Sequence, residues 1–178
     1  MPGRLEGQIA LISGSSQGFG RGVLETFLHE EALGLGLDLQ AVDGPSVAEE
    51  TWKRALETSI ERFGKAPSIV VHNAGWLYPN KSGLDVAVEE FDRLFNVNVR
   101  SIYLASNILV PELKNGPGST VSDATKAGVS SATKSMALEF ARDQLRFNAI
   151  CPTSGNTPLL NKFAGISDGP VLPEIIKA

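Results

Sequence analysis

The sequence predicts an α/β fold, a three-layer domain in which helices cover both faces of a mostly parallel sheet. Short apolar segments that are typical of buried strands alternate with segments whose apolar residues have helical spacing. A glycine-rich turn separates the first predicted strand from the first predicted helix. The chain has 178 residues, which suits one domain, and we therefore expect a single domain over residues 1–178.

The first part of the chain supplies three of the predicted strands and two helices. The apolar run at 8–13 indicates a buried strand, and the apolar spacing over 18–31 indicates a helix. Leucine alternates with glycine at 33–37, which is the period of a strand. A Ser-x-x-Glu capping pattern opens a helix over 46–63, and the apolar residues at 68–72 predict the next strand.

The second part of the chain predicts two long helices and one further strand. Residues 76–84 form a loop, and apolar positions at helical spacing follow over 85–110. Residues 120–142 are rich in Ala, Ser and Lys and are predicted to form a helix. A short strand at 146–150 follows, and an irregular tail begins at Cys151.

Composition excludes several classes of function. The net charge of −4 and the sequence pI near 5.2 argue against a nucleic-acid-binding protein and against a polybasic membrane anchor. No apolar run approaches the ~18 residues that span a bilayer, and the N-terminus lacks a signal-peptide core, so we expect a soluble cytoplasmic protein. The two histidines and the single Cys151 predict neither a metal site nor an internal disulfide.

The glycine-rich turn is the first candidate binding site. Gly14, Gly18 and Gly20 lie between the first strand and the first helix, where a diphosphate can approach the backbone and the helix N-terminus. Asp38 ends the second strand, where a carboxylate binds the ribose hydroxyls of NAD and repels the 2′-phosphate of NADP. Taken alone, the turn is equally consistent with a purely structural role. Asp38 favours the binding role, and the alternative for this residue is an exposed carboxylate at the end of a strand.

Five motifs in this order resemble the short-chain dehydrogenase/reductase family. The similarity runs from about residue 7 to about residue 165. The residues that carry it are Gly14, Gly18 and Gly20, then Asn73-Ala74-Gly75, Asn98, the Ser122-Asp-Ala-Thr-Lys126 segment, and the 146–150 strand with Pro152 and Thr157.

The resemblance implies a Rossmann-like fold and an NAD(P)-dependent oxidoreductase that acts on a small alcohol or carbonyl compound. In the family a tyrosine is the proton donor, a nearby lysine lowers its pKa and binds the nicotinamide ribose, and an asparagine organises a water. The residues implied here are, for catalysis, Asn98, Lys126 and Ser122, and, for the cofactor, Gly14, Ser16, Gly18, Phe19, Gly20, Asp38, Asn73, Ala74, Gly75, Lys126, Pro152 and Thr157. A homo-oligomer formed through helices 85–110 and 120–142 is also implied.

The chain departs from the family pattern in its catalytic residues and in its length. Ser122 stands at the tyrosine position, and Tyr78, in the loop after Gly75, is the alternative proton donor. The linker at 111–119 holds no apolar strand, so an internal strand and the catalytic serine beside it are expected to be absent. The segment at 39–46 and the C-terminus are also shorter than the family requires, which predicts a sheet with fewer strands.

These departures leave three hypotheses for the function. The first is an oxidoreductase with an incomplete catalytic set, whose chemistry is weaker because a positioned acid contributes ~10²- to 10⁴-fold. The second is a catalytically inactive nucleotide-binding or interaction subunit. The third is a truncated gene product that does not fold alone. Saturable NADH binding with turnover, binding without turnover, and a non-cooperative melt distinguish the three.

Overall fold

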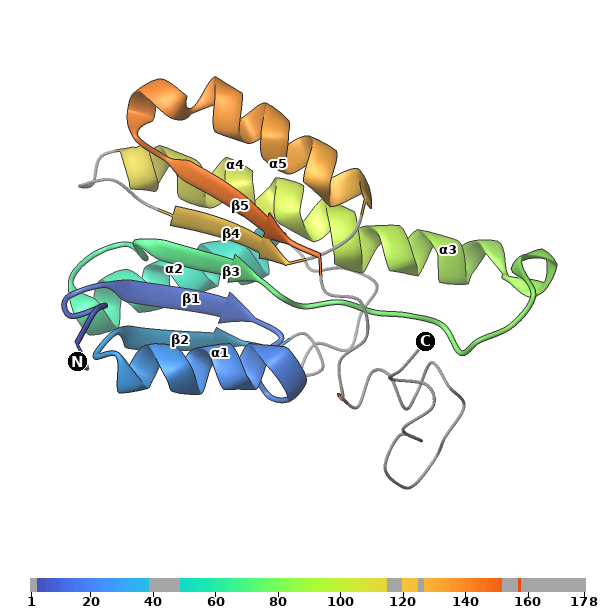
Figure 1. Ribbon diagram of the computed structural model, residues 1–178, viewed down its shortest axis with the longest axis horizontal. Helices are drawn as coiled ribbons and strands as arrows, with labels where there is room; N and C mark the ends of the chain where they lie inside the picture. Colours follow the sequence, from blue (N-terminus) through green and yellow to red (C-terminus); the bar gives the residue numbers. More distant parts are fainter. Residues whose placement is uncertain (1–2, 39–48, 115–119, 125–126, 152–156, 158–178) are drawn as a thin grey trace.

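A computed structural model describes residues 3–38, 49–114, 120–124, 127–151 and 157 of the chain. The strands in these residues form one parallel sheet in the order β2-β1-β3-β4-β5 (Figure 1). The strands are β1 (Ile9–Ser13), β2 (Leu33–Leu37), β3 (Ile69–His72), β4 (Thr120–Ala124) and β5 (Arg146–Ile150). The α/β fold that the sequence predicts is confirmed.

Helices lie on both faces of the sheet, as expected for a three-layer domain. On one face α1 (Gly18–His29) packs through Val23, Leu24 and Phe27. The opposite face holds α2 (Glu49–Phe63), α4 (Ser101–Lys114) and α5 (Ala127–Glu139) (Figure 1). The internal strand β1 is therefore buried from both faces of the sheet, which explains why its sequence is an unbroken apolar run.

The short helix α3 (Val88–Phe95) extends beyond the carboxyl ends of the strands (Figure 1). A π-helical turn, η3 (Asn96–Arg100), joins it to α4, so the predicted helix over 85–110 is observed over 88–114 with a bulge in its middle. Pro111 lies inside α4 and does not end it. Burial of Leu109, Val110 and Leu113 against the sheet holds the helix together beyond the proline.

The prediction of a helix over 120–142 is wrong in its first part. Residues Thr120–Ala124 form β4, which pairs with β3 on one side and with β5 on the other, and α5 begins only at Ala127. The internal strand that the sequence analysis expected to be absent is therefore present. Without it, backbone groups of β3 and β5 would lack partners, and the pairing requirement overrides the weak strand signal of these residues.

The expected short segments lie largely outside the described residues. Residues 39–46 are not described, nor is the capping pattern that precedes the first described residue of α2. Within 111–119, the first four residues belong to α4 and the others are not described.

Candidate functional site

The glycine-rich turn leaves the carboxyl end of β1 and leads into α1. Gly14 and Gly18 have φ angles of +69° and +57°, in the left-handed region that favours glycine. A Cβ on Gly14 would lie 2.8 Å from the Cα of Ala74, and a Cβ on Gly20 would collide with the carbonyl oxygen of Gly14 and with Asn73 Nδ2. The two glycines allow the backbones of the turn and of the segment after β3 to touch.

Hydrogen bonds join the backbone of the glycine turn to the segment after β3. The Ser13 hydroxyl, which is buried, accepts from the backbone N–H groups of Asn73 and Ala74, each at 3.1 Å. The Asn73 side chain donates from Nδ2 to the carbonyl oxygens of Ser13 at 3.1 Å and of Gly14 at 3.0 Å. Asn73 and Ala74 thus meet the glycine turn, as the sequence suggested, and the exposed Gly75 follows them. Sequence reasoning missed Ser13, although a hydroxyl at the end of an apolar strand was a usable signal.

The end of β2 reaches the same turn. The Gly14 N–H donates to the carbonyl oxygen of Leu37 at 2.7 Å, and the Ser16 N–H donates to Asp38 Oδ2 at 3.1 Å. The N-cap residue Gln17 makes no side-chain capping hydrogen bond at the N-terminus of α1, where Phe19 is exposed. A glycine turn, an uncapped helix N-terminus and an adjacent carboxylate fit the diphosphate and ribose of a dinucleotide.

Asn98 lies in the π-helical turn and is only 2% exposed. Its Nδ2 donates to the Trp76 carbonyl oxygen at 2.9 Å, and its Oδ1 accepts from the Trp76 N–H at 2.8 Å. Both polar atoms of this amide therefore hold the loop that follows Gly75. The role of Asn98 in organising a water stays a prediction. The bulge is supported by Ser101, whose hydroxyl donates to the Val97 carbonyl oxygen at 2.6 Å.

The positions implied for catalysis are not arranged as the motif spacing suggests. Ser122 lies in the middle of β4, where its register partners are Val71 and Asn148. It is not a helical residue, so the expected spacing of one helical turn to Lys126 is wrong. Lys126 and Pro152 lie outside the described residues, and Thr157 is described as half-buried in a bend. The structure therefore brings the glycine turn, Asp38 and the Asn73-Ala74 segment together, and the binding roles of these residues stay predictions.

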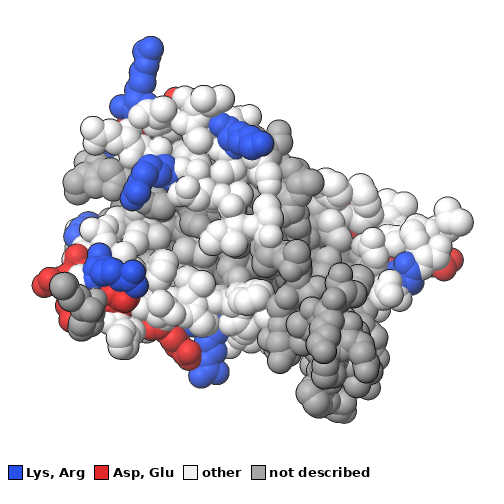
Figure 2. All heavy atoms as spheres, viewed as in Figure 1, with Lys and Arg blue, Asp and Glu red and all other residues white. Residues whose placement is uncertain are grey.

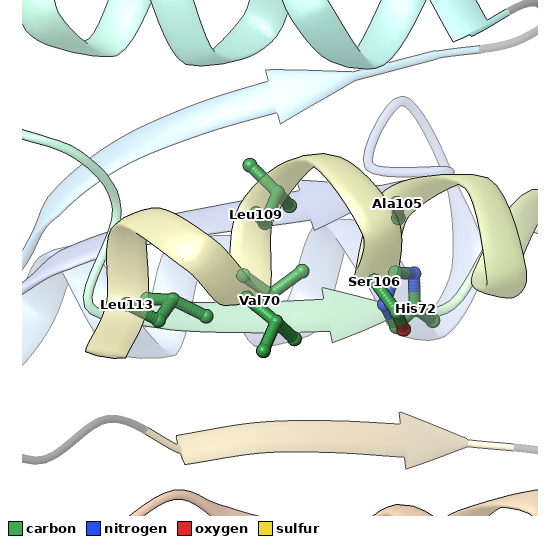
Figure 3. Close-up of a pocket in the computed structure, with 7 residues that line it drawn as sticks. Val70, His72, Ala105, Ser106, Leu109 and Leu113 are labelled. Atoms are coloured by element: carbon green, nitrogen blue, oxygen red, sulfur yellow. The ribbon is translucent and has the colours of Figure 1, made fainter. Parts of the chain in front are cut away.

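A buried histidine lies directly before the Asn73 segment. His72 is 4% exposed, and its Nδ1 has no hydrogen-bond partner among the described residues. The centres of the His72 and Trp52 rings lie 5.4 Å apart in an edge-to-face arrangement. It lines a narrow gap between β3 and α4, opposite Ala105 and Ser106 (Figure 3). Burial lowers the pKa of His72 from 6.5 to about 4, because the imidazolium would lose its hydration there.

The pKa of His72 predicts acid sensitivity. In the unfolded chain the imidazole of His72 is protonated below about pH 6.5, whereas in the folded chain it is protonated only below about pH 4. Because the unfolded state binds the proton first, the free energy of unfolding decreases as the pH falls from 6.5 to 4. We expect the free energy of unfolding to be about 2 kcal/mol lower at pH 5 than at pH 8 from this group. Urea titrations across this range would measure it. His72→Leu should flatten the dependence and the exposed His29→Leu should not; equal curves for all three proteins would contradict the assignment.

Lys and Arg side chains are scattered on the face that Figure 2 presents. Among the described residues, no three His, Cys, Asp or Glu side chains are grouped to hold a metal ion. No helix in the described part of the chain is long and apolar enough to cross a membrane.

Comparisons with known proteins show what this chain is similar to. The profile of the family described as "Enoyl-(Acyl carrier protein) reductase" matches residues 36–172. The chain is 30% identical to the 4-formylbenzenesulfonate dehydrogenase TsaC1/TsaC2 of Comamonas testosteroni over 202 residues, covering 93% of this chain and 80% of the relative. It is 29% identical to the oxidoreductase UcpA of Escherichia coli K12 over 216 residues, covering 99% and 81%. Both alignments exceed 178 residues, so these relatives contain residues within the matched span that this chain lacks.

Solved structures share the fold. The 3-ketoacyl-(acyl-carrier-protein) reductase from Brucella melitensis, complexed with NADH, is 30% identical with a TM-score of 0.81, over 90% of this chain and 81% of the other. The L-sorbose reductase from Gluconobacter frateurii, complexed with NADPH and L-sorbose, is 23% identical with a TM-score of 0.76, over 94% and 80%.

Proposed function

The chain belongs to the short-chain dehydrogenase/reductase family, and from this premise we propose that it is an NAD-dependent oxidoreductase acting on an alcohol or carbonyl group. The observation that carries the proposal is the close packing of the glycine turn: Gly14 lies against the Ala74 backbone, and Gly20 lies against the Gly14 carbonyl and the Asn73 side chain. A Cβ at either glycine would obstruct the approach of the turn to the segment after β3, beside the start of α1. A bound nicotinamide dinucleotide would supply the hydride chemistry.

The residues of the chain have separate tasks in this proposal. The turn from Gly14 to Gly20 binds the diphosphate through backbone N–H groups, and the Asp38 carboxylate accepts hydrogen bonds from the adenosine ribose. Asn73 and Ser13 keep the turn in position through the hydrogen bonds that join β1 to β3. Lys126 is proposed to bind the second ribose, as the family resemblance implies.

The choice of NAD over NADP rests on the charge of Asp38. Asp38→Asn keeps an oxygen that can accept the Ser16 N–H but removes the negative charge. We expect the ratio of NADPH to NADH affinity to rise about tenfold, because a repulsion of roughly 1–2 kcal/mol with the 2′-phosphate disappears. Fluorescence titrations with both nucleotides would measure the ratio, with Asp92→Asn on α3 as the control. An unchanged ratio would contradict the role given to Asp38.

A second candidate function is nucleotide binding without turnover. The observation that favours it is Ser122, which takes the tyrosine position of the motif and lies within β4. A serine hydroxyl is a much weaker acid than a phenol, and loss of a positioned acid costs ~10²- to 10⁴-fold in rate.

Titration of the purified protein with NADH, followed by an assay of NADH oxidation with a panel of aldehydes and ketones, separates the two candidates. Saturable binding with turnover supports the oxidoreductase. Saturable binding without turnover supports the second candidate. Folded protein that binds neither NADH nor NADPH at millimolar concentration would overturn both.

We also propose that the protein forms a homodimer through α3 and α4. Exposed apolar side chains follow one another at helical spacing along α3, η3 and α4: Val88, Phe91, Phe95, Val99 and Tyr103. Such a continuous exposed stripe is typical of an interface. Phe95→Glu is expected to weaken the dimer at least about 100-fold, because a buried unpaired charge is costly. Sedimentation velocity would measure it, with the exposed Ile60→Glu on α2 as control; a monomeric unmodified chain would contradict the proposal.

A further inference from the structure

The loop between Gly75 and α3 is fixed by aromatic and cationic contacts as well as by Asn98. The guanidinium carbon of Arg93 lies 4.9 Å above the centre of the Trp76 ring, and the Tyr78 ring meets Trp76 edge-on at 6.3 Å. Lys81 lies 5.9 Å over the Tyr78 ring. The loop therefore presents a fixed pair of half-buried aromatic rings.

The two cations of this cluster differ in their partners. Lys81 Nζ lies 2.6 Å from Glu90 Oε2 and 2.8 Å from Oε1, which lowers the pKa of Glu90 and balances the lysine charge. Arg93 forms no ion pair with any described carboxylate, and its side chain is exposed. A guanidinium that stacks on a ring keeps its in-plane N–H groups available for a carboxylate or a sulfonate.

This cluster adjoins the proposed dinucleotide site. Ala74 touches Gly14, and Trp76 follows Ala74 by two residues, a span of at most about 7 Å. Both backbone groups of Trp76 are hydrogen-bonded to Asn98, so the Trp76 backbone cannot move away from the turn without breaking two partly buried hydrogen bonds. The position places an aromatic surface and a positive charge beside the glycine turn of the proposed dinucleotide site.

We propose that Trp76 and Arg93 form a substrate subsite for an aromatic aldehyde or alcohol that carries an anionic group. The inference rests on the proposed function, and it names the substrate class of that site. The aromatic part of the ligand would pack against Trp76 and Tyr78, and its anion would accept two charge-assisted hydrogen bonds from Arg93. Glu89 and Asp92, exposed on the same helix, weaken the positive potential, so the selectivity for an anion is moderate.

The test compares 4-formylbenzoate with the uncharged 4-methylbenzaldehyde. Affinities are measured by ligand-observed NMR, both without nucleotide and with NAD⁺, which cannot reduce an aldehyde. We expect 4-formylbenzoate to bind about five- to tenfold more tightly, and we expect Arg93→Ala to bring the ratio close to one. Arg100→Ala, which removes an exposed arginine from the adjacent π-helical turn, should keep the ratio. Trp76→Leu should weaken the binding of both ligands.

NADH affinity and circular dichroism are measured on the same samples. These measurements distinguish failure of the proposed function from failure of the Trp76–Arg93 subsite. Folded protein that binds NADH but shows no Arg93-dependent preference would overturn the subsite and leave the proposed function standing. Protein that ignores NADH but keeps the preference would support the subsite and overturn the proposed function. Loss of both would overturn both.

Discussion

Gly20→Ala is expected to abolish dinucleotide binding. The added methyl group would overlap the carbonyl oxygen of Gly14 and the Nδ2 atom of Asn73, which belong to the turn and to the segment that holds it. The Gly14 carbonyl cannot move without moving the backbone of the turn. The Asn73 Nδ2 atom cannot move without breaking its hydrogen bonds to the carbonyl oxygens of Ser13 and Gly14. The turn would have to move away from β3, and we expect NADH affinity to fall at least about 100-fold.

Gly22→Ala is the matched control for this variant. Gly22 lies two residues further along α1, and a Cβ there would meet nothing within 4 Å. This substitution should stabilise the helix by roughly 0.5–1 kcal/mol and leave NADH affinity unchanged. Isothermal titration calorimetry on both variants would measure the affinities. If Gly20→Ala bound NADH like the unmodified protein, the cofactor would have to lie elsewhere.

Asn98→Ala is expected to cause the largest loss of stability. The substitution removes the two hydrogen bonds that Asn98 makes with the Trp76 backbone and opens a cavity at a side chain that is 2% exposed. The loss of such hydrogen bonds and the opening of a cavity each cost on the order of 1–3 kcal/mol, so we expect a loss of about 2–4 kcal/mol in the free energy of unfolding.

Asn107→Ala provides the comparison, since Asn107 is exposed on α4 and should change stability by only a few tenths of a kcal/mol. Urea denaturation followed by circular dichroism would measure both. Asn98→Ala should also weaken NADH binding, because the segment from Asn73 to Trp76 borders the glycine turn. Equal midpoints for the two variants would show that the Asn98 bonds contribute little to folding.

The sequence predicted those parts of the fold whose signal is local. β1, β2, β3 and β5 have apolar runs or alternating patterns and were found within a residue or two. β4 was missed because its five residues, Thr-Val-Ser-Asp-Ala, have no strong pattern of their own. They become a strand because β3 and β5 both need a partner, and a requirement between distant segments leaves little trace in local composition.

The same distinction applies to the candidate site. The glycine spacing and the Asn73-Ala74 pair could be recognised as motifs, and the structure brings them into contact. The Ser13 hydroxyl that joins them, and the amide of Asn98 that holds Trp76, depend on approaches between residues far apart in the chain. Pro111 is a strong local signal for the end of a helix, and the predicted helix ended at residue 110. The helix continues to Lys114 because its neighbouring residues are buried against the sheet.

The positions of the two tryptophans give the protein a built-in pair of optical probes. Trp52 is 1% exposed in the core beside His72, whereas Trp76 is half-buried at the border of the glycine turn. A red shift of Trp52 emission would report the opening of the core during denaturation. Energy transfer from Trp76 to a reduced nicotinamide would report occupancy of the turn. One emission spectrum would therefore follow unfolding and ligand arrival as separate events, without any label.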